Sequence, residues 1–279
     1  MRTQVATDAG SSAAPSEDRV LVSPSVLVVL DGATARTGTG CIHGVAWYAD
    51  QLATAVMGCA HLGPAGALTA AISRTAAMHR DTCDLRHPGT PSAAVGIVQV
   101  EDDRLRYLVL GDVTIVVDAG PAELVVSDAR VDGTAQAERA EADALPAGSP
   151  EKAAALVRMK HAELAARNTA GGYWIAAAEP NAVEHALIGE VPLAEVRRAA
   201  ILTDGAARVV DLFQLCDWPE ALAVLATDGP RELINRVRST EASDPRGERW
   251  PRNKVSDDAT VVYCDAFPGA SDGTHDRAS

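Results

Sequence analysis

Three aspartates stand at the ends of predicted strands, where their carboxylates could converge on a metal ion. Asp31 and Asp204 each close an apolar run and are followed by glycine, whereas Asp257 comes just before the apolar run 260–264. Hard divalent cations such as Mg²⁺ and Mn²⁺ bind oxygen ligands, so a few carboxylates meeting at sheet ends suffice to hold them. The glycine lets the backbone approach closely enough for its carbonyl to serve as a ligand. Strand-terminal Asp-Gly pairs can also simply mark turns, but three aspartates at strand ends together favour a metal centre.

The charge balance of the chain narrows the classes of partner. Its 279 residues include 38 acidic and 25 basic side chains, which give a formal net charge of −13. This balance repels phosphate backbones and anionic lipid, so we expect neither nucleic acid nor a membrane surface as a partner. No apolar stretch approaches the roughly 20 residues of a membrane span, and the N-terminus lacks a signal-peptide core.

The cysteines show no recognisable framework. They are odd in number and include no Cys-x-x-Cys pair, so the sequence predicts neither a zinc site nor a secreted disulfide scaffold. A reducing cytoplasm is therefore the expected location. The five are Cys41, Cys59, Cys83, Cys216 and Cys264.

The elements that must position the aspartates form strand blocks separated by helices. Two short strands precede two helices, a four-stranded meander follows between Ala93 and Val126, and Ser149 has the features of an N-cap for a helix reaching about Arg167. This arrangement predicts an α+β sandwich rather than a βαβ wind. Later strands are expected at 173–177, 183–187, 199–202 and 260–264, and later helices at 206–212, 219–225 and 231–237.

The two ends of the chain differ in composition from its middle. Residues 1–15 are small and polar, and we expect a flexible N-terminus there. Residues 16–266 are expected to form a single domain, and residues 267–279 a disordered tail. Within the domain, residues 133–148 are rich in Ala and Glu and are expected to be a loop.

Six short motifs resemble, in the same order, those of the metal-dependent serine/threonine protein phosphatases, the PPM or type 2C family. The similarity spans roughly residues 16–265, and the shared order makes it specific although each motif is weak alone. It implies a four-layer α-β-β-α sandwich with two central, mostly antiparallel sheets. The motifs are Ser16-Glu17-Asp18, Asp31-Gly32, Leu110-Gly111-Asp112, Ser127-Asp128, Leu202-Thr203-Asp204-Gly205 and Asp257-Asp258-Ala259-Thr260.

The resemblance also implies roles for individual residues. Asp31 would bridge two Mn²⁺ or Mg²⁺ ions, and the Gly32 carbonyl would ligate one of them. Asp18 would hold a metal-bound water, and Asp128 would help to bind a third ion. Two ions about 3.5–4 Å apart can activate a water for in-line attack on phosphorus without a covalent phosphoenzyme. The remaining metal ligands implied are Asp204 and Asp257.

The phosphate-binding part of the family pattern is altered. Family members usually carry an arginine shortly before the acidic motif, but residues 10–15 contain none. Arg19 and Arg36 are the nearest replacements, because a guanidinium can contact phosphate through two hydrogen bonds. A solvated surface position is the alternative for both arginines. His43 could protonate a leaving oxygen, although a lone histidine is more often structural.

Three functions remain open from the sequence. The first is hydrolysis of phosphoserine or phosphothreonine on a bacterial phosphoprotein in signalling, the substrate of a Ser/Thr kinase. The second is a catalytically weak or inactive module that binds a phosphoprotein or regulates a kinase pathway, which the missing arginine motivates. The third is hydrolysis of a small phosphorylated metabolite. The first and third predict Mn²⁺-dependent turnover, whereas the second predicts binding alone; the oligomeric state is left open.

Overall fold

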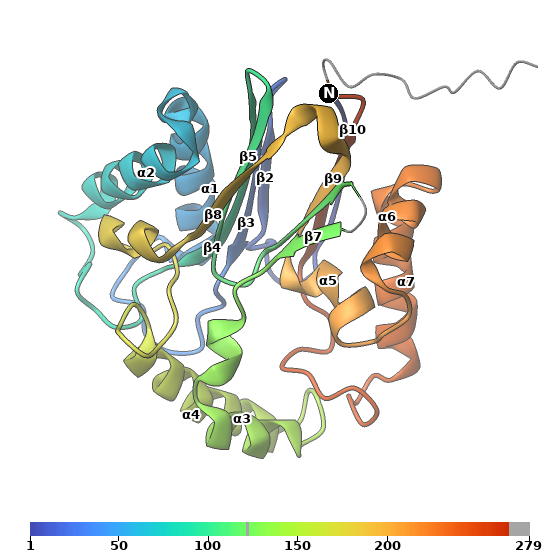
Figure 1. Ribbon diagram of the computed structural model, residues 1–279. Coiled ribbons are helices and arrows are strands. Elements are labelled where there is room, and N and C mark those ends of the chain that lie inside the picture. The colour runs from blue at the N-terminus through green and yellow to red at the C-terminus, as the bar shows by residue number, and fades with distance from the viewer. Residues whose placement is uncertain (121–122, 268–279) are drawn as a thin grey trace, which may run out of the picture.

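Two antiparallel β-sheets face each other at the centre of the molecule, with helices on both outer sides (Figure 1). The computed structural model describes residues 1–120 and 123–267. The predicted four-layer α-β-β-α sandwich is confirmed. One sheet contains, in spatial order, β1 (Arg2–Asp8), β10 (Ala259–Asp265), β9 (Val196–Leu202), β6 (Thr114–Ala119) and β7 (Glu123–Val126). The other contains β2 (Arg19–Val22), β3 (Val26–Gly32), β4 (Ala93–Glu101), β5 (Arg104–Leu110) and β8 (Leu187–Pro192).

The helices form one cover on each sheet and a third group at one end of the sandwich (Figure 1). The sheet that contains β3 is covered by α1 (Gly44–Gly58) and α2 (Gly63–His79). The other sheet is covered by α5 (Asp204–Asp211), α6 (Trp218–Thr227) and α7 (Pro230–Ser243). The third group consists of α3 (Gln136–Asp143) and α4 (Pro150–Ala166). Short 3-10 turns occur at η1 (Ala60–Leu62), η2 (Ala129–Gly133), η3 (Pro180–His185) and η4 (Leu193–Glu195).

Strand β3 shows how the sequence builds these layers. Successive side chains of a strand point to opposite faces of the sheet, so an all-apolar strand fits only where both faces are covered. Val28 and Leu30 pack toward α1 and α2, whereas Leu27 and Val29 pack into the layer between the two sheets. All four are fully buried. The apolar run that precedes Asp31 therefore fixes the end of β3 deep inside the sandwich.

The N-terminal segment is an edge strand, and the expectation of a flexible N-terminus is wrong. Strand β1 pairs with β10 along its whole length, from Arg2 opposite Asp265 to Asp8 opposite Ala259. Backbone hydrogen bonds rather than apolar side chains hold it, since Ala6 is its one buried residue. Composition could not reveal such a strand. Of the predicted tail, Phe267 is buried between the sheets, and the rest lies outside the described residues.

Residues 136–143 form helix α3, although the sequence predicted a loop there. The helix has one buried residue, Ala142, which packs in a small cluster with side chains of α4. The buried Lys152 ammonium donates to the carbonyls of Ala142 at 2.8 Å and Leu145 at 3.2 Å, and so satisfies the C-terminal end of α3. This helix depends on tertiary contacts.

The strands expected at 173–177 and 183–187 are not strands. The first segment makes only isolated bridges, and the second is largely the turn η3 before β8 begins at Leu187. The Asn168 side chain replaces a strand partner, because its Oδ1 accepts from the Ile175 N–H at 2.8 Å and its Nδ2 donates to the Ile175 carbonyl at 3.0 Å. Apolar patterning therefore predicted the burial of Ile175 but not its hydrogen bonding.

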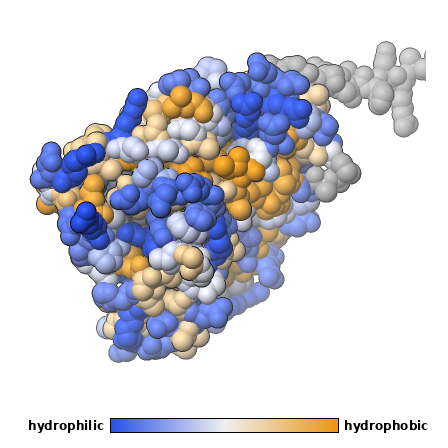
Figure 2. Space-filling view, turned by 60° about the vertical axis from the view of Figure 1, so that its left-hand side comes forward, coloured by the Kyte–Doolittle hydropathy of each residue, from blue (hydrophilic) through white to orange (hydrophobic). Residues whose placement is uncertain are grey.

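The surface mixes hydrophilic and hydrophobic side chains on the face shown in Figure 2. Exposed apolar residues include Leu187 and Ile188 on the edge strand β8. Single exposed apolar side chains are normal for a folded protein. Among the described residues, no single helix has the length and apolar character needed to cross a membrane. Within residues 1–120 and 123–267, the pair α1 and η1–α2, bent by 62° at its break, meets those criteria when joined.

Gly96 on β4 marks a place where the two sheets are in tight contact. A Cβ there would lie 2.7 Å from Val113 Cγ1 and 2.9 Å from Ile201 Cγ2. We expect Gly96→Ala to lower the free energy of unfolding by about 1–3 kcal/mol, because overpacking forces the sheets apart. At Gly58, at the end of α1, a Cβ meets nothing within 4 Å.

Gly58→Ala is thus the matched control and should be neutral or stabilising by up to about 1 kcal/mol. Urea unfolding measures both changes. Equal shifts in the two variants would contradict the assignment of Gly96 to a tight sheet–sheet contact.

Candidate metal centre

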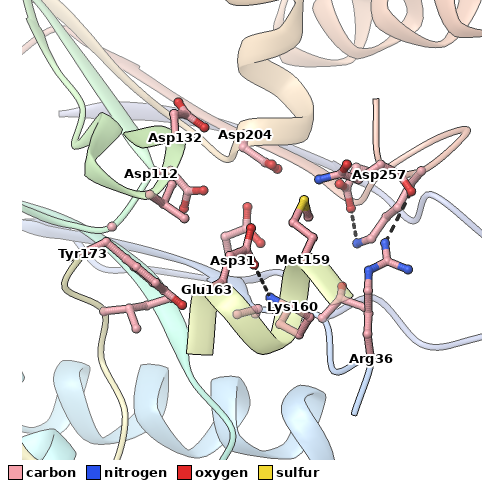
Figure 3. Close-up of a pocket in the computed structure, with 18 of the residues that line it drawn as sticks. Asp31, Arg36, Asp112, Asp132, Met159, Lys160, Glu163, Tyr173, Asp204 and Asp257 are labelled. Carbon is pink, nitrogen blue, oxygen red and sulfur yellow. Dashed lines mark hydrogen bonds and ion pairs between the residues drawn. The ribbon is translucent and has the colours of Figure 1, made fainter. Parts of the chain in front are cut away.

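An open cavity of about 180 Å³ lies where strand ends from both sheets approach α4 (Figure 3). Asp31 reaches it from the end of β3, and Asp112 from the turn after β5. Asp204 reaches it from the start of α5, directly after β9, and Asp257 from the segment before β10. The three aspartates singled out in the sequence therefore line one cavity, with Asp112 beside them. Since a water takes about 30 Å³ of liquid, the space admits several waters or ions.

These carboxylates oppose one another's ionisation. Burial, then the charges of Asp204 and Asp18, raise the pKa of Asp31 well above its ordinary value. Burial and the charge of Asp257 raise the pKa of Asp204, and burial with the charge of Asp204 raises the pKa of Asp112 to about 7. Like charges held together out of water favour the neutral form in this way. The site is thus built to attract positive charge.

A divalent cation fits this set of donors. Asp31 Oδ2 and Asp18 Oδ1 are buried and have no hydrogen-bond partner among the described residues. A buried carboxylate oxygen without a partner is costly. A hard cation would supply the missing partner and reduce the repulsion, and oxygen donors suit Mg²⁺ or Mn²⁺ better than soft ions.

Close packing explains the glycines that follow Asp31 and Asp204. A Cβ at Gly205 would lie 2.0 Å from the Asp258 carbonyl oxygen, and a Cβ at Gly32 would lie 2.8 Å from the Glu17 carbonyl oxygen. Any side chain at either position would push neighbouring backbone away from the centre. Gly32 also lines the cavity itself, as a carbonyl ligand would need to do.

Asp18 is buried and is not among the residues that line the cavity. The Thr203 hydroxyl donates to Asp18 Oδ2 at 2.9 Å and accepts from the Thr260 N–H at 2.9 Å. Burial raises the pKa of Asp18 to about 8, against the opposing effect of its threonine hydrogen bonds. This placement suits a carboxylate that acts on the centre through an intervening water.

Solved structures that resemble this chain identify its architecture. The serine/threonine phosphatase PstP/Ppp of Mycobacterium tuberculosis aligns with a TM-score of 0.56 at 16% identity, covering 95% of this chain and 97% of that one. PppA of Pseudomonas aeruginosa aligns with a TM-score of 0.57 at 13% identity, with the same coverage. The chain has the fold of the PPM-type serine/threonine phosphatases. No protein-family model and no curated protein matches the sequence.

Two further PPM-fold structures bear on the site. The catalytic domain of PstP, in a complex with two manganese ions, aligns with a TM-score of 0.53 at 16% identity over 95% of this chain and 97% of that one. A bacterial serine phosphatase aligns with a TM-score of 0.59 at 12% identity over 96% of this chain and 98% of that one. At these identities the likeness shows the fold, and the site has to be judged on its own residues.

Of the two candidate phosphate-binding arginines, only Arg36 lines the cavity. The expectation that Arg19 could face the centre is wrong. Its guanidinium donates to the carbonyls of Ser16 and Asp18, both at 2.7 Å, and pairs with Asp50 at 3.4 Å. The Arg36 guanidinium donates to the Asn253 carbonyl at 3.4 Å and has no carboxylate ion-pair partner in residues 1–120 and 123–267.

Asp128 does not line the cavity, which corrects its assignment as a ligand of a third ion. Its carboxylate caps η2 and accepts from Arg130 Nε at 2.7 and 2.9 Å. Asp132, four residues further along the chain, lines the cavity instead. The turn η2 decides this outcome by carrying Asp132 inward while Asp128 is neutralised by its neighbour.

The Asp257 carboxylate forms ion pairs with two basic side chains that were not predicted from the sequence. Arg208 Nη2 contacts Asp257 Oδ2 at 2.9 Å, and the Lys254 ammonium is paired with Asp257 Oδ1. Arg208 also contacts the buried Glu241 at 2.8 Å. Helical spacing was an available signal for Arg208, which lies one turn after Asp204. Asp257 is therefore partly neutralised, whereas Asp31 retains an unpartnered oxygen.

His43, considered as a general acid, does not line the carboxylate cavity. Its ring stacks on Trp47 with centroids 4.1 Å apart, and its Nδ1 lies 3.4 Å from Cys83 Sγ. The structure thus assigns His43 to a different cluster of side chains.

Because the carboxylates at the centre repel one another, we expect the Asp→Asn substitution to have opposite effects on stability at Asp31 and at Asp118. In the presence of a chelator, Asp31→Asn should raise the free energy of unfolding by about 0.5–2 kcal/mol, because it removes one of the carboxylates that repel one another. Functional sites commonly lower stability in this way. Because the pKa of Asp31 is raised in the folded protein, its destabilising effect is complete above that pKa and declines as the pH falls from there to the ordinary aspartate pKa. The difference from wild type should therefore shrink on acidification.

Asp118→Asn is the matched control. Although burial opposes it, hydrogen bonds from Arg197 and Arg198 lower the pKa of Asp118, so this carboxylate stabilises the fold. The control should lose stability, most at neutral pH. Denaturant unfolding as a function of pH measures both, and a loss of stability in chelated Asp31→Asn would contradict the repulsion.

Proposed function

We propose that this protein is a metal-dependent phosphoester hydrolase acting on phosphoserine or phosphothreonine in a protein. The observation that carries the proposal is the convergence of Asp31, Asp204 and Asp257 on one cavity of a PPM fold, with an unpartnered buried oxygen on Asp31. Hydrolysis of a phosphate ester needs a nucleophilic water and a means to neutralise the phosphoryl charge. The residues of the cavity offer both functions.

Asp31, the Gly32 carbonyl and Asp204 would hold two Mn²⁺ or Mg²⁺ ions, with Asp257 as the fourth protein ligand. Bound together, such ions supply an activated water and stabilise charge on the attacking and leaving oxygens. Asp18 would orient a water from beneath the cavity. Asp132 is placed to contribute to any third ion in place of Asp128.

Arg36 would bind the phosphate of the substrate. It lines the cavity and makes no ion pair with a carboxylate in the described part of the chain, so its guanidinium remains available. Lys160 and Arg139, which also line the cavity, are each paired with Glu163 at 3.1 Å. Preorganised positive charge beside the phosphoryl group is the main protein contribution to such reactions.

A second function, a catalytically weak or inactive module that binds a phosphoprotein or regulates a kinase pathway, is favoured by one observation. Lys254 and Arg208 already occupy both carboxylate oxygens of Asp257. A metal ion would have to compete with these cations for that ligand. The two functions predict different results. The enzyme should show turnover with Mn²⁺, whereas the inactive module should bind a phosphoprotein without turnover.

The expected partner is a phosphoprotein, the substrate of a Ser/Thr kinase, rather than nucleic acid or a membrane. A small phosphorylated metabolite is the remaining alternative substrate. The five cysteines are free, which fits a reducing compartment such as the cytoplasm.

We expect Mn²⁺-dependent, chelator-sensitive hydrolysis of para-nitrophenyl phosphate and of a phosphothreonine peptide. Arg36→Ala should lower kcat/KM for the peptide by about 10²-fold, as loss of a charge-stabilising donor does, while Mn²⁺ affinity changes little. Arg19→Ala is the matched control, because Arg19 does not line the cavity, and it should retain wild-type kinetics. Asp31→Asn should abolish turnover and weaken calorimetric Mn²⁺ binding.

Equal losses in Arg36→Ala and Arg19→Ala would show that phosphate is held elsewhere. If saturating Mn²⁺ gives no turnover while the phosphopeptide still binds, the non-enzymatic function replaces the first. Turnover of small phosphate esters alone, with no phosphopeptide activity, would instead assign a metabolite substrate.

A further inference from the structure

A second cluster of potential metal ligands lies near the paired ends of α1 and α2. Cys41 and His43 precede α1, His79 is the last residue of α2, and Cys83 follows in the next loop. The four ligand atoms all lie within 4.8 Å of one another. The absence of a Cys-x-x-Cys pair had predicted no zinc site, but the chain carries a Cys-x-His pair and a His-x₃-Cys pair that lie far apart in sequence. Folding the α1–α2 hairpin brings them together.

The spacing of these atoms fits a tetrahedral ion. Zn–S bonds of about 2.3 Å and Zn–N bonds of about 2.0–2.1 Å place a sulfur and a nitrogen ligand about 3.6 Å apart. Cys41 Sγ lies 3.6 Å from His43 Nδ1 and 3.5 Å from His79 Nδ1, and Cys83 Sγ lies 3.4 Å from His43 Nδ1. The two sulfurs, at 3.1 Å, would need only a small side-chain rotation to reach the tetrahedral separation of about 3.8 Å.

Neighbouring groups prepare these side chains for a metal. His79 is buried, and its Nε2 has no hydrogen-bond partner in the described residues, so the ring's polar contacts are confined to the cluster. The His43 backbone N–H points at Cys41 Sγ at 3.4 Å, a contact that favours a thiolate. Trp47 stacks on His43 and lies 5.2 Å from the His79 ring, which limits the movement of both imidazoles.

We propose that Cys41, His43, His79 and Cys83 bind one Zn²⁺ ion as a structural site. Two thiolates and two imidazoles in a tetrahedral set are typical of zinc, and four protein ligands leave no open position for catalysis. This ligand chemistry differs from that of the carboxylate centre, which suits hard cations. The inference therefore does not rest on the proposed hydrolase function.

The ion would fasten the segment that carries Arg36. This segment runs from Asp31-Gly32 to α1, and the Asp84 N–H already donates to the Gly40 carbonyl at 2.8 Å. A zinc ion would link the end of that segment to the end of α2 through four bonds. It would thus hold one wall of the carboxylate cavity in place without contacting the cavity itself.

The test uses the full chain, stripped of metal with a chelator under reducing conditions and titrated with Co²⁺ as a spectroscopic substitute for Zn²⁺. We expect one equivalent of Co²⁺ to give the intense visible bands of a tetrahedral ion and sulfur-to-cobalt charge transfer in the near ultraviolet. One equivalent of Zn²⁺ should abolish both signals, whereas Mg²⁺ should not. Protein purified without chelator should contain one zinc per chain by mass spectrometry.

Cys83→Ser should weaken Co²⁺ and Zn²⁺ binding by at least about 10–100-fold. Loss of a residue that only hydrogen-bonds a metal ligand has an effect of that size, and loss of the ligand itself should cost no less. Cys216→Ser is the matched control, because Cys216 is a free, partly exposed cysteine outside the cluster, and it should bind as wild type does. In wild type, zinc should slow alkylation of Cys41 and Cys83 but not of Cys216. Asp31→Asn should keep its zinc, which separates failure of this site from failure of the carboxylate centre.

Absence of the tetrahedral cobalt spectrum in wild type would overturn the proposal whether or not any variant folds. Equal binding by Cys83→Ser and Cys216→Ser would overturn it as well. Formation of a Cys41–Cys83 disulfide in place of zinc binding, detected by mass when reductant is absent and zinc is supplied, would assign the cluster to redox chemistry instead.

Discussion

The structure depends on holding several carboxylates together against their mutual repulsion. Asp31, Asp112 and Asp204 meet where strands from both sheets end, and each has a raised pKa because burial and its neighbours disfavour the charged form. Nothing within that group stabilises it. The free energy has to come from the apolar layers, which begin directly before Asp31: Leu30 packs toward α1 and α2, and Val29 packs between the two sheets. A sandwich with three apolar layers can tolerate a strained polar site at its edge.

Most of the precision at this site comes from residues that do not line it. Thr203 connects the buried Asp18 to the backbone of Thr260, and so joins β2, β9 and β10 beneath the cavity. Asp258 accepts from the N–H groups of Gly10 at 2.9 Å and Glu17 at 2.6 Å. The second carboxylate of the Asp257-Asp258 pair therefore fixes the N-terminal segment rather than facing the cavity.

The two candidate metal sites differ in the donor atoms that they offer to a cation. Oxygen donors gather where strands of the two sheets end, and sulfur and imidazole donors gather at the ends of two helices. Carboxylate and carbonyl oxygens suit Mg²⁺ and Mn²⁺, whereas thiolates and imidazoles suit Zn²⁺. The segment between Gly32 and Cys41 connects them and carries Arg36, so the position of this arginine depends on both.

The sequence by itself determined the layers and the principal carboxylates. The unbroken apolar run of β3, the helical periodicity of α1 and α2, and the Asp-Gly pairs were enough, because these signals are local and each follows from backbone geometry. The tertiary structure decided everything that depends on distant partners. Strand β1 exists because β10 offers it hydrogen bonds, and Lys152 supports α3. Arg36 rather than Arg19 faces the cavity, and Cys41 meets His79 only when the helical hairpin closes. Local sequence patterns cannot predict such contacts, because their free energy arises only when chain segments far apart in sequence pack together.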